Sequence, residues 1–584
     1  MHPGNNIYLR HFKPGMYEIT AFGIIALAIL VRILLIAYGW PHTESDEGAI
    51  DLMALHIAYR GEHPIFIYHQ SYMGSLEAFL GAGLFHIFGV SVFTVRLGLI
   101  IFFALFLISM YLMTSLLYNK KFALFTLLLL SLGSSSILSR EVEALGGRPE
   151  NLFLGSMMML LASWLALTYR RGISRRKQLV RTALYGILGL TTGLAIWSDL
   201  LILPFVLMVA LFLAFFCWRE LRRWALACLV SGLLIGVFPV IVFNIRAHSG
   251  PDTLSAILSV RQGPQSFATY HLPRIQGIFA TVQESLPHAT GAYPLCPVEL
   301  SPFPEHLGPH GLQCTLAYGG WGLGFITLLI LALLLAIAGL YTFWSHYRIK
   351  KISSEDRQHA IRHAARLVLL GGAGITLMLF ALSPQTALLP FRSVRYLTPL
   401  LVAAPAVIWP LWLGASRIQQ LNSLKRATIK VIICQALLLL IAVTLLLDTI
   451  NTFGEIPKAQ AVTQHQTRLI QDLQRIHATH IYADYETCYW LVFATNEQII
   501  CSALEGSTLY SFDKYTLYGA IVRRDPYSPY VFPLHSAQAA TFAQKAAASP
   551  HRFQRLEFDG YVIYRPMASL PPTTFSKRAN RETF

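Results

Sequence analysis

Two adjacent carboxylates, Asp46 and Glu47, are the residues of this chain best placed to do chemistry. They follow an apolar segment at about 16–40 and open an amphipathic stretch that runs to Arg60. Adjacent side chains on a helix point about 100° apart, so one acid can face a pocket while the other pairs elsewhere. A helix N-terminus keeps a carboxylate ionised, as a general base requires. The pair therefore predicts a catalytic site, with simple helix capping as the alternative.

Two arginines, Arg392 and Arg395, lie near the start of a later apolar segment at about 394–414. With the neighbouring Tyr396, they are candidates for substrate binding at a membrane boundary. The alternative is that their side chains reach lipid head groups.

Other polar side chains are expected on the same side of the membrane as the acidic pair. They are weaker candidates for a substrate pocket: His69, Gln70, Tyr72, Glu77, Glu143, Arg148 and Asp199. The structural alternatives are interface contacts, a salt-bridged turn around Arg148, and capping of a helix by Asp199. No set of these residues predicts a metal site.

The composition indicates a polytopic membrane protein. Of the 584 residues, 54% are hydrophobic and 13% are charged, whereas soluble domains carry about 25% charged residues. The net charge of +16 does not indicate nucleic acid, because the basic residues lie mainly in short loops, where they set membrane topology.

The hydropathy pattern predicts eleven spanning segments. They are expected at about 16–40, 94–117, 122–138, 151–169, 182–198, 200–217, 224–243, 321–345, 366–383, 394–414 and 428–448. The first lacks a cleavage site and is expected to remain as an anchor. A shorter stretch, 75–89, is expected to lie in the membrane interface. The basic clusters then place the N-terminus in the cytoplasm.

This topology puts the polar mass on the extracytoplasmic side. Loops 41–93 and 244–320 belong to the membrane domain, 1–448, and the tail is expected to form a small α/β domain at 449–570, with disordered residues at 571–584. Within the tail, the pattern predicts helices at 461–478 and 536–549, strands at 480–484 and 498–501, and a hairpin turning at Asp559-Gly560. Two disulfides are possible in an oxidising compartment, Cys296–Cys314 and Cys488–Cys501, with free buried thiols as the alternative.

The order of these features resembles the GT-C glycosyltransferases of the protein O-mannosyltransferase and aminoarabinose-transferase type. The matching features are Asp46-Glu47 after the first span, the interfacial helix ending in Phe88-Gly89, and Arg395-Tyr396-x-x-Pro399; the likeness covers about 40–450. One departure is notable. Many members have Lys-Pro-Pro-Leu before the interfacial helix, where this chain reads Gln70-Ser-Tyr-Met-Gly-Ser-Leu-Glu77, so a phosphate-binding lysine is missing.

The resemblance implies an activity. It implies that a sugar moves, with inversion, from a polyprenyl-phosphate donor to an acceptor hydroxyl or amine on the extracytoplasmic face of the plasma membrane, with Asp46 as general base. Such a reaction needs cations beside the leaving phosphate, and Arg392 and Arg395 are the candidates, because arginine binds phosphate bidentately. The expected partners are the lipid-linked donor, the bilayer and a glycan, lipid or protein acceptor, with no nucleic acid, nucleotide, metal or other cofactor.

Three other activities fit parts of the same pattern. A lipid-linked sugar flippase predicts repeated halves and broken mid-membrane helices. A non-catalytic glycan-binding protein predicts that Asp46 is dispensable. An oligosaccharyl or wall-polymer ligase shares the architecture. The sequence contains no internal repeat, which favours the transferase over the flippase.

Overall fold

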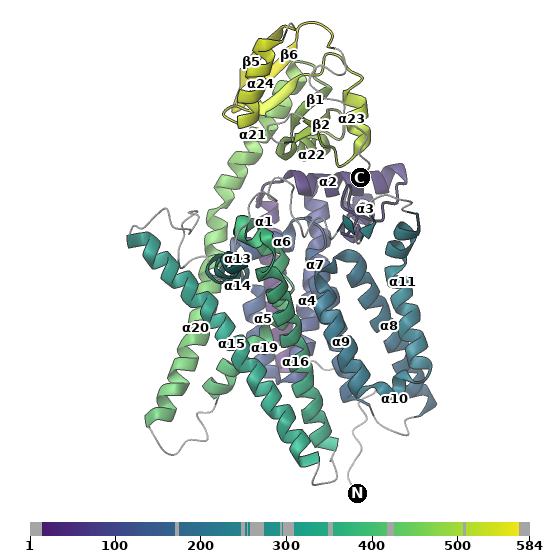
Figure 1. The fold of residues 1–584 in the computed structure, drawn as a ribbon, viewed down its shortest axis with the longest axis vertical. Helices are drawn as coiled ribbons and strands as arrows, with labels where there is room; N and C mark the ends of the chain where they lie inside the picture. Colours follow the sequence, from purple (N-terminus) through teal and green to yellow (C-terminus); the bar gives the residue numbers. More distant parts are fainter. Residues whose placement is uncertain are drawn as a thin grey trace.

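The protein is an elongated helical bundle that carries a small sheet-containing domain at one end (Figure 1). The computed structural model describes residues 15–169, 174–246, 252–253, 255–256, 274–292, 295, 309–347, 354–416, 425–505, 510–549 and 551–570. Within these ranges, eight helical segments are long and apolar enough to cross a membrane, and two further helix pairs qualify when each bent pair is counted as one span. The chain is therefore a multi-pass integral membrane protein, as the composition predicts, with a C-terminal α/β domain, as the pattern of the tail predicts.

The long helices follow the apolar segments of the sequence. They are α1 (Met16–Ala37), α4 (Val92–Leu117), α7 (Arg148–Leu167), α8 (Arg175–Ser198), α11 (Trp224–Arg246), α15 (Pro309–Tyr347), α16 (Ser354–Ala381) and α20 (Lys425–Gly454). The short helix predicted at 75–89 is α3 (Leu76–Phe88), whose 13 residues are too few to cross a bilayer that needs about 20. The span predicted at 200–217 consists of the 3₁₀ turn η1 (Leu200–Ile202) and α9 (Leu203–Phe216).

Two predicted spans are broken, which corrects the expectation that each is one continuous helix. The segment at 122–138 divides into α5 (Lys120–Ser131) and α6 (Ser135–Val142), bent by 87°. At the break, the backbone N–H of Gly133 donates to the Thr449 hydroxyl at 3.0 Å and not to a carbonyl of the preceding helical turn. The segment at 394–414 divides into Pro390–Leu397 and α19 (Leu400–Ala415), bent by 81°; Pro399 at this break has no backbone N–H to donate.

The remaining helices connect these segments. They are α2 (Ser45–Arg60), α10 (Trp218–Leu221), α13 (Arg274–Ala280), the π-helix η3 (Thr281–Ser285), α14 (Leu286–Thr290), α17 (Pro384–Leu388), α18 (Pro390–Ser393) and η5 (Val394–Leu397). About half of the predicted central loop, 244–320, lies outside the described residues. Within the described part, α15 already begins at Pro309 and so starts earlier than the predicted span.

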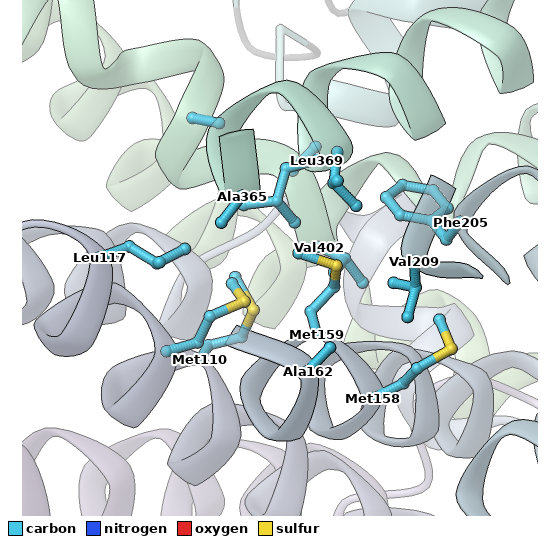
Figure 2. Packing of buried hydrophobic residues seen from close by; sticks show 14 of the residues in the cluster. Met110, Leu117, Met158, Met159, Ala162, Phe205, Val209, Ala365, Leu369 and Val402 are labelled. Carbon is cyan, nitrogen blue, oxygen red and sulfur yellow. The ribbon is translucent and has the colours of Figure 1, made fainter. Parts of the chain in front are cut away.

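The bundle is held together by side chains that interlock between helices. Figure 2 shows Met110 of α4, Met159 of α7, Phe205 of α9, Leu369 of α16 and Val402 of α19 in one buried cluster. Each of these five side chains is 1% exposed or less. Dispersion contacts of this kind drive helix association in lipid, where the hydrophobic effect does not.

Helices α8 and α11 pack more closely than any large side chain would permit. A Cβ added to Gly189 would lie 2.0 Å from the carbonyl oxygen of Leu229, and one added to Gly232 would lie 2.1 Å from that of Gly186. Gly193 and Gly236 repeat this contact one turn further on. The pairs are spaced four residues apart on each helix, which is the small-residue pattern that lets membrane helices approach backbone to backbone.

The C-terminal domain is a six-stranded sheet with helices packed against it. Its strand order is β3-β2-β1-β4-β6-β5; β1 pairs in parallel with β2 and β4, and the other pairs are antiparallel. The strands are β1 (His480–Asp484), β2 (Ile500–Glu505), β3 (Tyr510–Ser511), β4 (Tyr530–Pro533), β5 (Phe553–Phe558) and β6 (Tyr561–Pro566), and the helices are α21 (Ile456–Arg475), α22 (Tyr485–Ala494), α23 (Thr516–Val522) and α24 (Ala537–Ala548).

The sequence predicted much of this domain and missed part of it. Helices α21 and α24, strands β1 and β2, and the hairpin of β5 and β6 are confirmed, with Gly560 supplying the positive φ of 79° at the turn. Helix α22 was not expected. It follows Asp484, whose carboxylate accepts from the backbone N–H of Thr487 at 2.9 Å and so caps the helix.

One predicted disulfide is present. Cys488 on α22 and Cys501 on β2 are bonded, with Cα atoms 5.3 Å apart and a separation of 13 positions in sequence. Cys296 of the other predicted pair lies outside the described residues. The Cys488–Cys501 bond fixes α22 to the sheet, which matters because α22 is the helix that faces the membrane domain.

Loss of this disulfide is expected to loosen the C-terminal domain. Replacing both Cys488 and Cys501 with serine should lower the free energy of unfolding by about 2–4 kcal/mol, because a short closed loop is no longer constrained in the unfolded chain. Thermal unfolding of the full-length protein in detergent checks this. The free thiol Cys228 provides the matched control as Cys228→Ser, and equal melting temperatures for all three proteins would contradict the prediction.

Candidate active site

Helix α2 places the acidic pair between the membrane domain and the C-terminal domain. The helix runs from Ser45 to Arg60 and is capped by Gly61, which has a left-handed φ of 67°. A Cβ added to Gly48 would lie 2.4 Å from the backbone nitrogen of Trp490, so α22 rests directly on the first turn of α2. The Ser45 hydroxyl donates to the carbonyl of Tyr485 and accepts from the N–H of Tyr489.

Asp46 lies at the centre of a cluster of donors. Its Oδ1 accepts from the Lys514 ammonium at 2.6 Å and from the Tyr485 hydroxyl at 2.5 Å. Its Oδ2 faces Nη1 of Arg395 at 3.9 Å. Asp46 remains 37% exposed, so one side of the carboxylate is open to a small cleft.

The charges around Asp46 keep it ionised. Burial alone would raise its pKa, but the Lys514 ammonium, the Tyr485 hydroxyl and the Arg395 guanidinium together lower the pKa to about 2. Burial and the Asp46 charge raise the pKa of Tyr485, which therefore stays protonated as a hydrogen-bond donor. The cleft thus contains a carboxylate at physiological pH, held by three donors.

The cleft carries more cations than carboxylates. Its lining residues are Asp46, Ile50, Ile67, Gln70, Tyr72, Met73, Leu145, Arg148, Arg395, Tyr396 and Lys514. Arg148 is paired with Asp199 at 3.2 Å, and its guanidinium carbon lies 5.8 Å from the centre of the Tyr396 ring. Three basic side chains therefore face one lining carboxylate and one neighbouring carboxylate, which suits the cleft to an anion.

Six of the predicted site residues meet at this cleft. They are Asp46, Gln70, Tyr72, Arg148, Arg395 and Tyr396. Asp199 lies beside it, accepting from the N–H of Leu201 as well as from Arg148. His69 is exposed and packs edge-on against Phe512 at 4.9 Å.

The other predicted residues are placed away from the cleft. Glu47 is 1% exposed and forms a bidentate ion pair with Arg96, at 2.7 and 2.5 Å. Glu77 is buried and accepts from the N–H of Gly146, Glu143 is buried, and Arg392 is exposed. The acids of the pair thus have different surroundings, as their angular separation on α2 predicts.

Two residues of the cluster, Lys514 and Tyr485, were not expected from the sequence. Both belong to the C-terminal domain, 468 and 439 positions from Asp46. No motif marks either one. The only local signal is that Tyr485 follows the capping residue Asp484, which places it in the first turn of a helix.

An apolar cavity of about 540 Å³ lies in the membrane part of the protein. Leucines and other apolar side chains from α5, α15, α19 and α20 form most of its wall. Leu400 and Leu401 line it, and they follow Arg395 and Tyr396 of the cleft by only a few positions. One short stretch of chain therefore contributes both to the cationic cleft and to the apolar cavity. No cluster of three or more metal-binding side chains occurs among the described residues.

Solved structures with the same architecture are glycosyltransferases. ArnT from Cupriavidus metallidurans bound to undecaprenyl phosphate matches with a TM-score of 0.52 and 13% identity, over 94% of this chain and 98% of that one. The apo oligosaccharyltransferase of Archaeoglobus fulgidus matches with a TM-score of 0.51 and 13% identity, over 96% and 76%. No protein-family model and no curated protein matches the chain. At this identity the likeness establishes the architecture: the chain has the GT-C fold.

Proposed function

We propose that this protein is a membrane glycosyltransferase that takes its sugar from a polyprenyl-phosphate donor on the extracytoplasmic face. One observation carries the proposal: an ionised carboxylate, Asp46, shares a cleft with Arg395, Arg148 and Lys514, and the stretch of chain that carries Arg395 goes on to line an apolar cavity at Leu400 and Leu401. A lipid-linked phosphate has this combination of an anionic head and an apolar chain. The cavity is suited to the polyprenyl chain, and the cations are suited to the phosphate.

The same arrangement supports a direct displacement. An acceptor hydroxyl or amine attacks the anomeric carbon, and the bond from that carbon to the phosphate oxygen breaks. Polyprenyl phosphate leaves with the bonding electrons, and the acceptor proton passes to Asp46. Attack from the side opposite the phosphate inverts the anomeric centre. Cations fixed beside the phosphate stabilise the charge that develops on the leaving group.

The ArnT structure supports the choice of donor class. In that structure ArnT is bound to undecaprenyl phosphate, which is a leaving group of the kind that the proposed reaction releases. The acceptor and the sugar are left open by the cleft, because its lining polar residues, Gln70, Tyr72 and Tyr396, can hydrogen-bond to many hydroxyl-bearing molecules.

Release of polyprenyl phosphate tests the proposal. Purified full-length protein in lipid nanodiscs should turn over at least one member of a panel of undecaprenyl-phosphate sugars, either onto an acceptor or, more slowly, onto water. Donors with a two-isoprene chain should have a higher KM, because they leave most of the apolar cavity unfilled. Absence of turnover with every donor, together with movement of the lipid between leaflets, would favour a flippase instead.

A further inference from the structure

The cleft contains a lysine that the membrane domain does not supply. Lys514 lies between β3 and α23 of the C-terminal domain, and its side chain is 5% exposed. Its ammonium is 2.6 Å from Asp46 Oδ1 and 5.1 Å from the centre of the Tyr485 ring. Burial of a lysine this complete requires a partner, and in this structure the partner is Asp46.

The backbone around Lys514 is fixed to the rest of its domain. The N–H of Lys514 donates to the Tyr489 hydroxyl, and the preceding Asp513 accepts from the N–H of Ala503 at 2.8 Å and from the Ser502 hydroxyl at 3.1 Å. These contacts attach the segment to α22 and β2. The position of the Lys514 backbone is therefore set by the sheet, while the ammonium lies at the end of a four-carbon stem and can reorient.

The same segment is also tied to the first loop of the membrane domain. Tyr515, the next residue, donates to Glu62 at 2.7 Å, and Tyr68 donates to the same carboxylate at 2.6 Å. His56 of α2 lies 3.1 Å from Glu497 of the C-terminal domain. Contacts on both sides of the cleft thus hold the domain in place, and Lys514 enters the site because the domain is docked.

We propose that Lys514 is a donor-positioning residue, whose ammonium leaves Asp46 and pairs with the donor phosphate when the lipid-linked sugar binds. This inference rests on the proposed function. Asp46 cannot take a proton readily while an ammonium is bound to it, because the positive charge favours the ionised carboxylate. Transfer of the ammonium to the phosphate therefore completes the phosphate site and frees the base in one step.

This exchange gives the C-terminal domain a role in the chemistry. The segment before α3 lacks the lysine expected there from the resemblance, and a lysine from a different part of the chain occupies the cleft. The exchange also sets the order of substrate binding, since Asp46 becomes available to an acceptor only after the donor phosphate is present. Hydrolysis or transfer without a correctly seated donor is thereby suppressed.

Binding of undecaprenyl phosphate to the full-length protein in nanodiscs tests the exchange. Lys514→Met should weaken binding by about 10- to 100-fold, the range expected when a hydrogen bond to a charged group is lost, and Lys514→Arg should restore a large part of it. Lys545→Met, at an exposed position of α24 in the same domain, is the matched control and should bind like the wild type. Undecaprenol, which has no phosphate, should bind equally to all four proteins.

The variant Asp46→Asn distinguishes exchange from a purely structural lysine. Removing the competing carboxylate should tighten undecaprenyl phosphate binding by roughly two- to fivefold, as expected for a partly exposed ion pair. In the Lys514→Met background the same substitution should give a clearly smaller gain, because the competition no longer exists. An equal gain in both backgrounds would show simple repulsion between Asp46 and the phosphate and would overturn the exchange.

The outcomes separate this inference from the proposed function. If the wild type binds undecaprenyl phosphate more tightly than undecaprenol but Lys514→Met binds it equally well, the exchange is wrong and the donor class stands. If the wild type does not distinguish the two lipids, both are wrong. A folded Lys514→Arg variant that binds undecaprenyl phosphate no better than Lys514→Met would also overturn the exchange, because an arginine at this position should partly replace the lysine as a partner of the phosphate.

Discussion

Asp46→Asn is expected to lower kcat/KM for sugar transfer by at least about 10²-fold, the contribution typical of a general base. Asparagine has the shape of aspartate and can still accept from the Tyr485 hydroxyl, so the fold should persist. The measurement is the rate of polyprenyl phosphate release from the donor identified in the panel, with the melting temperature recorded alongside.

The matched control for Asp46→Asn is Glu44→Gln. Glu44 lies two residues earlier, as the N-cap residue of α2, and its side chain is 54% exposed. The same change from carboxylate to amide there should leave the rate within about twofold, as for a surface substitution. Equal rates for Asp46→Asn and Glu44→Gln would remove Asp46 from the mechanism.

The pH dependence follows from the lowered pKa of Asp46. The pKa of Asp46 is about 2, so the carboxylate is ionised in the donor-free enzyme at ordinary assay pH. The parameter kcat/KM reports the ionisation of groups in the free enzyme. Protonation of Asp46 should therefore not reduce kcat/KM in that range. In Lys514→Met, burial still raises the pKa of Asp46, but the ammonium that lowers this pKa is gone. The pKa of Asp46 therefore rises, and the fall of kcat/KM on the acid side should begin at a higher pH. An unchanged profile would show that Lys514 does not control the charge of Asp46.

Arg96→Met is expected to cause the largest loss of stability, about 3–5 kcal/mol, because it leaves a buried carboxylate without its partner. Arg96 is 3% exposed and binds Glu47 through two nitrogens, while its Nη1 donates to the carbonyl of Pro41 at 2.7 Å. Fully buried Asp51 lies one helical turn after Glu47, so an unpaired charge would stand beside another acid. Denaturant or thermal unfolding of the purified protein measures the loss.

The double variant Arg96→Met/Glu47→Gln provides the control. Removing both charges should recover much of the lost stability, since replacing a buried pair with neutral groups costs far less than breaking it. Arg524→Met, at an exposed position of the C-terminal domain, should have little effect. If Arg96→Met unfolds like Arg524→Met, the buried pair does not hold the start of α2.

The fold could be predicted from the sequence wherever the cause is local. Apolar length identifies a membrane helix, because roughly 20 residues must shield their own backbone in lipid. The α/β pattern of the tail and the Asp559-Gly560 turn are likewise local. Neither bend was predicted, because a hydropathy average runs over many residues and each break is only a few residues long. The first lies between Ser131 and Ser135, and the second lies at Pro399 between Leu397 and Leu400.

The sequence by itself determined that this is a membrane protein, because apolar length is a local property. It also identified the acidic pair at the start of α2 and the arginines Arg392 and Arg395, because charged residues at a membrane boundary are recognisable by type. Only the tertiary structure decided that Asp46 faces the cleft while Glu47 is buried against Arg96, and that Lys514 and Tyr485 complete the cluster. Helical geometry separates two neighbouring acids, but which one is buried depends on the helices packed around α2. Contacts across more than 400 positions arise from the docking of one domain on another. Hydrophobic periodicity predicts only local secondary structure and therefore cannot predict such contacts.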